Sequence, residues 1–135
     1  MADEEQQAVR RAADGFYAAL EQVLAGDAGA MAACWSHADD VTYMGPRGGF
    51  QVGWAAVHAE WQGQAAGRYG GSVRPHNIRV TVGDALAFVQ SNLRNVGVAG
   101  PDAIVDFRAT LLLRKEAGVW KTVGVHTDLF DAIRT

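Results

Sequence analysis

The sequence predicts an α+β domain in which helices from the first half of the chain cover one face of a curved antiparallel sheet from the second half. Apolar residues in the first half recur every three or four positions, which is the period of amphipathic helices. From residue 73 onwards, segments rich in strand-forming residues alternate with short glycine-containing loops, which favour hairpins over helical crossovers. Helices and strands that are segregated in this way bury their apolar faces against each other.

The first predicted element is a long amphipathic helix that starts at Asp3 and ends near Gly26. Asp3 and Gln6 have the spacing of a capping box, and two glutamates follow Asp3 in the first turn, where they stabilise the helix dipole. One large apolar stripe runs along the helix: Val9, Ala12, Ala13, Phe16, Tyr17, Leu20, Val23 and Leu24.

Shorter elements follow this helix. Asp27 can cap a second helix that extends to about Trp35, and residues 41–44 form a short strand that the glycine-rich turn 45–49 closes. A third helix runs from residue 53 or 54 to 66. Four long strands are then predicted at 73–82, 85–96, 103–114 and 119 to about 130.

The last strand carries a titratable pair, His126 and Asp128. Because side chains alternate along a strand, both are predicted to share a face with Trp120 and Thr122, opposite Val125. The pair either lines the floor of a pocket or is hydrogen-bonded and locks the core.

The preceding strand also has a polar face and an apolar face. Asp106, Arg108 and Thr110 share the polar face, but the pattern does not reveal which face is concave. If the polar face lines a pocket, Arg108 would lie near His126 and Asp128 and could bind a carboxylate or an enolate-like oxygen. If it is convex, Arg108 belongs to a dimer interface. In the third alternative, Arg108 only forms an ion pair with an aspartate and takes no part in a reaction.

Composition narrows the class of protein further. With 135 residues, of which 49% are hydrophobic, the chain is expected to fold as one domain over 1–135. The net charge of −3 and the mixed distribution of charges provide neither a basic face for nucleic acid nor a polybasic strip for a membrane. Cys34 is the only cysteine, and the acidic N-terminus does not resemble a signal peptide, so a cytoplasmic protein is expected.

The sequence lacks the motifs that are typical of several classes of enzyme and nucleotide-binding protein. The sequence has no nucleophile elbow, no phosphate-binding glycine loop and no dinucleotide-binding fingerprint. Only His126 with Asp128, and the scattered His37, Asp39 and Asp40, could serve as metal ligands, so no metal site is predicted. No cofactor is expected either.

The chain resembles the nuclear transport factor 2-like superfamily, and within it the SnoaL-like and ketosteroid-isomerase-like small proteins. The residues that carry this resemblance lie along nearly the whole chain: Phe16-Tyr17-Ala-Ala-Leu20, Ala25-Gly26-Asp27, Trp35 to Tyr43, Gly53-Trp54, Phe107 to Arg114, Gly118-Val-Trp120-Lys and His126. The resemblance implies a cone-shaped, cystatin-like fold with about three N-terminal helices on the sheet. It also implies a homodimer and a pocket between the helices and the concave face.

The resemblance also suggests roles for single residues. Steroid isomerases of this superfamily have an aspartate base just before a proline that follows an Ala-Asp-Asp run, and here Gly45 occupies that position before Pro46. Since glycine cannot accept a proton, the isomerase chemistry is not expected in that arrangement. The acid of the oxyanion site corresponds to a position near Thr110, and the isomerase tyrosine to Tyr17. SnoaL-like relatives commonly carry residues that match Arg108 and His126.

Aromatic residues complete the predicted site. Trp35, Tyr43, Trp54 and Trp61 are candidates for the walls and rim of the pocket, with core packing as the alternative for each. Three functions remain open. The first is an enzyme that isomerises, cyclises, dehydrates or hydrolyses a small apolar carbonyl compound, with His126 as acid or base and Asp128 orienting it. The second is a carrier or sensor of a small apolar or carboxylate-bearing ligand, and the third is an association module.

Overall fold

The computed structural model describes residues 2–98 and 100–129. Its helices are α1 (Ala2–Leu24), α2 (Gly29–Cys34) and α3 (Trp54–Ala66). Its strands are β1 (Thr42–Met44), β2 (Phe50–Val52), β3 (Ser72–Val82), β4 (Leu86–Val96), β5 (Ile104–Glu116) and β6 (Val119–Leu129). The predicted α+β class is confirmed. The predicted end of the last strand, Phe130, lies outside the described residues.

All these strands form one sheet, in the order β2-β1-β6-β5-β4-β3. The four long strands pair as antiparallel neighbours, as the short loops predicted. The edge near α3 differs from the prediction, because β1 pairs in parallel with β6 and forms a hairpin with β2 around the glycine-rich turn. β2 has only three residues and no distinctive alternation, so the sequence did not indicate it.

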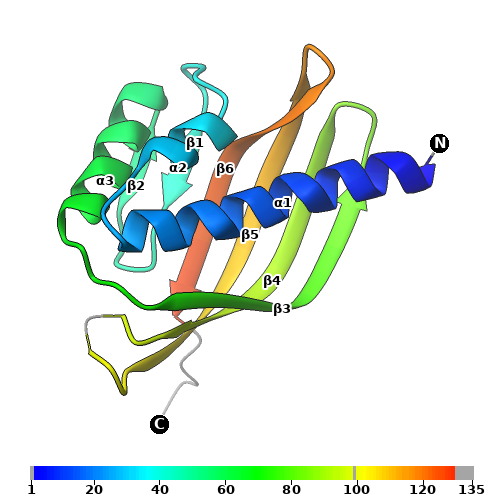
Figure 1. Cartoon of the computed structure of the whole chain (residues 1–135). Coiled ribbons are helices and arrows are strands. Elements are labelled where there is room, and N and C mark those ends of the chain that lie inside the picture. The colour runs from blue at the N-terminus through cyan, green and yellow to red at the C-terminus, as the bar shows by residue number, and fades with distance from the viewer. Residues whose placement is uncertain (1, 99, 130–135) are drawn as a thin grey trace, which may run out of the picture.

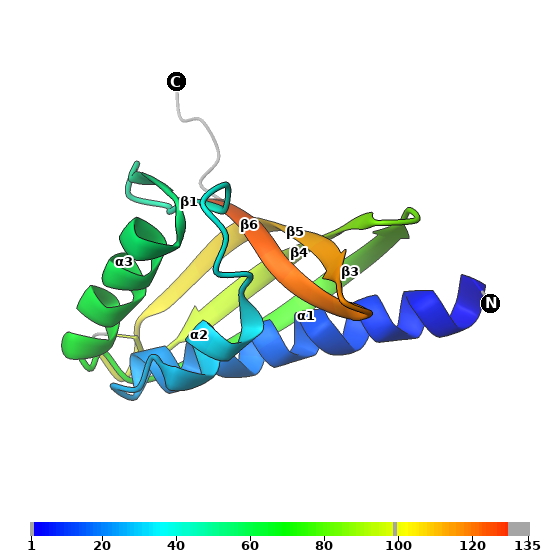
Figure 2. The same ribbon diagram turned by 90° about the horizontal axis from the view of Figure 1, so that it is seen from above.

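The helices cover one face of the sheet. Figure 1 shows α1 crossing the long strands, with α3 beside β1 and β2. In Figure 2 the sheet curves over α1, and α2 lies on the same side. We call this side of the sheet the inner face. The core consists of the predicted stripe of α1 packed against buried inner-face residues such as Val89, Leu111 and Leu113.

A β-bulge in β6 changes which side chains face inward. Leu112 pairs with Gly124 and Leu113 with Thr122, so Val123 has no partner in the ladder. An extra residue reverses the alternation beyond it. Thr122 and Val125 are therefore both buried under the helices, whereas His126 is exposed on the opposite, outer face. The prediction that His126 shares a face with Trp120 and Thr122 is wrong for this reason.

Candidate functional site

A cavity of about 350 Å³ lies between the inner face of the sheet, α1 and α3. Its walls are mostly apolar, with Phe16 and Leu20 from α1, Trp61 from α3, Leu93 from β4 and Val125 from β6. These positions follow from the helical and strand periods, which direct one stripe of each element to the same space. A largely apolar hollow of this size suits a small organic molecule.

Tyr43 and Trp61 form the aromatic wall of the cavity. Their rings stack at a centroid distance of 4.4 Å and an interplanar angle of 10°. The Tyr43 hydroxyl accepts a hydrogen bond of 3.1 Å from Gln64 Nε2, which also donates to Glu60 Oε1 at 3.3 Å. Burial of the hydroxyl raises the pKa of Tyr43 to about 12. Tyr43 is therefore a neutral phenol at physiological pH.

Among the residues that line the cavity, three polar side-chain atoms are buried and have no hydrogen-bond partner in the described part of the chain. They are Trp61 Nε1, Asn95 Oδ1 and Thr127 Oγ1. Leaving a buried donor or acceptor unpaired costs about 1–3 kcal/mol, so such groups usually have a partner in the functional state. Asn95 is at the end of β4 and Thr127 near the end of β6, so these two atoms belong to the sheet side of the cavity.

The turn between β1 and β2 borders the cavity. Gly45, Pro46, Arg47 and Gly49 contribute to the lining, and Arg47 is exposed. The turn is closed by backbone hydrogen bonds between Gly45 and Gly49 and between Gly48 and Gly45. Gly48 has a φ of 95°, a conformation that side-chain-bearing residues rarely adopt.

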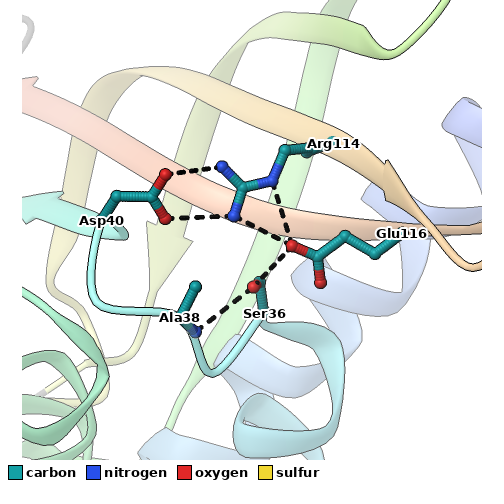
Figure 3. Close-up of polar contacts among 5 residues, drawn as sticks. All are labelled: Ser36, Ala38, Asp40, Arg114 and Glu116. Carbon is teal, nitrogen blue, oxygen red and sulfur yellow. Dashed lines mark hydrogen bonds and ion pairs between the residues drawn. The ribbon is translucent and has the colours of Figure 1, made fainter.

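A polar network fixes the segment that leads into β1 (Figure 3). Arg114 on β5 donates to both carboxylate oxygens of Asp40, at 2.7 and 3.0 Å. Glu116 accepts from Arg114 at 3.0 Å and from the Ser36 hydroxyl at 2.8 Å. The hydrogen bond from Arg114 lowers the pKa of Asp40, and that from Ser36 lowers the pKa of Glu116. The Ala-Asp-Asp run thus anchors the chain on the sheet just before Tyr43.

Comparison with known proteins identifies the family. The sequence profile of the SnoaL-like domain matches residues 9–128. The chain belongs to the SnoaL-like domain family. The predicted relationship to the nuclear transport factor 2-like superfamily is therefore confirmed. No curated protein matches the sequence.

Solved structures share the fold of this SnoaL-like domain. A candidate dehydratase of the nuclear transport factor 2-like family from Streptomyces avermitilis is 22% identical with a TM-score of 0.83, over 98% of this chain and 100% of that one. A candidate calcium/calmodulin-dependent protein kinase type II association domain from Thiobacillus denitrificans is 24% identical with a TM-score of 0.77, over 89% and 93%. A candidate ketosteroid isomerase from Parabacteroides distasonis is 18% identical with a TM-score of 0.68, over 87% and 86%.

Four of the predicted site residues lie on the outer face of this SnoaL-like domain. Arg108, Thr110, His126 and Asp128 line a polar groove of about 460 Å³ there. Arg108 donates to both oxygens of Asp128, at 2.9 and 2.7 Å, and this hydrogen bonding lowers the pKa of Asp128. Of the alternatives that the sequence left open, the one in which the polar face lines the pocket is wrong. The cavity faces the apolar side of β5, and the bulge in β6 places His126 and Asp128 on the outer face.

The aromatic candidates divide between cavity and core. Tyr43 and Trp61 line the cavity as predicted, whereas Tyr17, Trp35 and Trp54 are not among its lining residues. Tyr17 is buried and shares a hydrogen bond of 2.9 Å with Ser91 on β4. Trp35 is fully buried and its indole N–H donates to Met31 Sδ. Trp54 is stacked between two imidazoles, those of His37 and His58.

Several polar residues of the cavity lining were not predicted, among them Glu60, Gln64, Asn95 and Thr127. A signal for the first two was present, because Glu60 and Gln64 flank the buried stripe of Val57 and Trp61 on α3. Asn95 continues the inward-facing series of β4 that includes Val89 and Leu93. The face of Thr127 could not be predicted from strand alternation, because the bulge places this residue on the inner face.

Two further expectations concern metals and membranes. In the described part of the chain, no group of three or more His, Cys, Asp or Glu side chains is arranged to hold a metal ion. No helix among the described residues is both long enough and apolar enough to cross a membrane.

Burial raises the pKa of the Cys34 thiol, which makes this cysteine a poor nucleophile at neutral pH.

Proposed function

We propose that the cavity binds a small, largely apolar molecule that carries a carbonyl oxygen. The observation that supports this proposal best is a cavity of about 350 Å³ with mostly apolar walls and a few polar side chains, among them Tyr43, Gln64 and Thr127. Apolar walls provide affinity, and a few polar groups fix the orientation of the ligand. Hydroxyl groups such as those of Tyr43 and Thr127 can donate a hydrogen bond to a carbonyl oxygen.

The family assignment favours the same kind of function. Relatives in fold include a candidate dehydratase and a candidate ketosteroid isomerase, whose names imply small organic substrates. The anchored β1 segment supports the proposal as well, because Arg114 fixes Asp40, three residues before Tyr43, and the Tyr43 ring stacks on Trp61. A pre-formed site loses little entropy when it binds.

Ligand-induced thermal stabilisation tests this proposal. The probe is 2-acetylnaphthalene, a flat apolar ketone, and the blocking variant is Leu93→Trp, which fills the cavity from β4. Leu86→Trp is the matched control, because it makes the same substitution on the outer face of the same strand. At saturating ketone, the melting temperatures of the wild type and Leu86→Trp should rise by several degrees, and that of Leu93→Trp should not. Equal shifts in all three proteins would contradict the proposal.

Proton transfer on the bound ligand is a second candidate function, and Glu60 is the observation that favours it. Glu60 lines the cavity, whereas the position of the isomerase base is glycine in this chain. A carboxylate beside an α-carbon could remove a proton from a ketone. The test is exchange of the methyl hydrogens of 2-acetylnaphthalene for deuterium, followed by NMR. Exchange by the wild type and not by Glu60→Gln indicates an enzyme, whereas binding without exchange indicates a carrier.

We further propose that the outer face forms a homodimer. Phe88 and Leu112 are paired across β4 and β5 and are 37% and 45% exposed. The same face carries Arg108 and Asp128, whose side chains are 61% and 44% exposed. A twofold contact places the same patch of both copies together, so apolar residues can meet and opposite charges can pair across it.

A further inference from the structure

The Tyr43 hydroxyl has a fixed role in its hydrogen-bond network. Gln64 contacts the Glu60 carboxylate, which can only accept, so the Gln64 atom involved must be the amide nitrogen. That nitrogen has a second hydrogen, which it donates to the Tyr43 oxygen at 3.1 Å. The carboxylate therefore orients the amide, and the amide makes the phenol an acceptor. The phenol keeps its own proton for another partner.

Space for that partner lies beside Gly45. A β-carbon at position 45 would lie 3.3 Å from the Tyr43 oxygen and 3.4 Å from the ring carbon that carries it. Because the residue is glycine, no side chain crowds the hydroxyl on this side. Gly45 and Tyr43 both line the cavity.

We propose that the Tyr43 hydroxyl donates a hydrogen bond to the carbonyl oxygen of a neutral ligand, in the space that Gly45 leaves open. This inference rests on the proposed function of the cavity and specifies the chemistry of its ligand. Gly45, which occupies the position of the isomerase base, thus leaves room for the ligand oxygen to reach the phenol.

The hydrogen-bond network around the hydroxyl favours a neutral ligand; Arg47, the positively charged residue of the cavity lining, is exposed on the turn. Glu60 is joined to Tyr43 through one amide group, so a carboxylate ligand at the hydroxyl would bring two negative charges close together in a partly dry site. The high pKa of Tyr43 means that the phenol stays protonated and acts as a donor and not as a base. A ketone, ester or amide oxygen meets both conditions.

A matched pair of probes isolates this hydrogen bond. 2-Acetylnaphthalene has a carbonyl oxygen, and 2-isopropenylnaphthalene has the same shape with a methylene group in its place. Binding is measured by quenching of tryptophan fluorescence. We expect the wild type to bind the ketone about 5–10 times more tightly than the alkene, which corresponds to one net hydrogen bond. 2-Naphthoate should bind more weakly than the ketone at neutral pH.

Three variants separate the contributions. Tyr43→Phe should bind both probes with about equal affinity, while Tyr17→Phe should keep the preference, because Tyr17 bonds to Ser91 and does not line the cavity. Gly45→Ala keeps the hydroxyl and crowds it, so the preference for the ketone should shrink. Gly45→Ala gives a result even if Tyr43→Phe were to fold poorly.

The outcomes distinguish this inference from the proposed function. If the wild type binds ketone and alkene equally, or if Tyr43→Phe retains the preference, Tyr43 is not the donor, although the cavity still binds ligands. Tighter binding of 2-naphthoate than of the ketone would overturn the selection for neutral ligands. If neither naphthalene binds the wild type at all, the proposed function fails and this inference fails with it.

Discussion

At the scale of single residues, the cavity depends on a few polar side chains inside apolar walls. Tyr43 shows how position determines chemistry, because the same residue type in Tyr17 is bonded to Ser91 away from the cavity. Both tyrosines were predicted as ligand-binding residues, Tyr43 as an aromatic wall with a polar tip and Tyr17 from its match to the isomerase tyrosine. Only the turn and the β1–β6 pairing bring Tyr43 to the cavity, and these depend on contacts between distant segments.

Because the phenol of Tyr43 is buried, the stability of the folded protein should fall as the pH rises through the alkaline range. Its pKa is about 12 in the folded protein against an ordinary value of 10, so the unfolded chain releases this proton first. The free energy of unfolding should therefore fall between pH 10 and pH 12, by about 2–3 kcal/mol for two pKa units. Denaturant unfolding at both ends of this range should show a smaller fall for Tyr43→Phe than for the wild type. Equal falls would contradict the burial of the hydroxyl.

At the scale of elements, the long helices and strands follow from the sequence, and the faces of β6 do not. The apolar side of β5 was predicted correctly, because its alternation is unbroken from Val105 to Leu113. On β6 the bulge at Val123 reverses the alternation, so the faces of His126 and Asp128 were predicted wrongly. A bulge is a matter of register between two strands, and the period of one strand cannot reveal it.

The bulge itself can be tested at Gly124. A β-carbon at this position would lie 3.0 Å from Leu112 Cδ1 and 3.2 Å from Thr42 Oγ1. We expect Gly124→Ala to lower the free energy of unfolding by about 1 kcal/mol, because the crowded neighbours must shift. In a double-mutant cycle, the same change should cost less in a Leu112→Ala background. Additive effects would contradict the contact that the bulge creates.

The network that holds the segment before β1 gives a second prediction at this scale. Asp40 and Glu116 have lowered pKa values, so their ionised forms stabilise the folded state at neutral pH, and this stabilisation is lost as the pH falls through their folded pKa values. Arg114→Gln should lower the melting temperature by a few degrees at neutral pH. The difference from the wild type should narrow below pH 4, where both carboxylates become protonated. A constant difference across this range would contradict the role of the ion pairs.

At the scale of the whole molecule, the sequence predicted the two layers but not which face of the sheet is concave. That choice depends on the curvature of the sheet and on where α1 and α3 dock, and these are properties of the assembled fold. The observed arrangement separates two surfaces that the sequence analysis had merged. The inner face holds the cavity, and the outer face holds the polar groove with exposed apolar neighbours.

The oligomeric state tests the role of the outer face. We expect the wild type to sediment as a dimer and Leu112→Glu to sediment as a monomer, because the new charge would be buried in the interface. Gln62→Glu is a control that adds the same charge at an exposed position of α3, away from the outer face of the sheet. Its dimer should weaken less. A wild-type protein that remains monomeric at high concentration would rule out this interface.

The most direct measurement of ligand binding is an NMR titration of the isotope-labelled protein with 2-acetylnaphthalene, with every shifted resonance mapped on the fold. Binding between the layers predicts that the largest shifts occur at Tyr43, Trp61, Leu93 and Val125, while Arg108 and His126 change little. Saturable shifts centred on Arg108 and His126, with the first four residues unchanged, would show that the ligand binds the outer groove and contradict the proposed cavity.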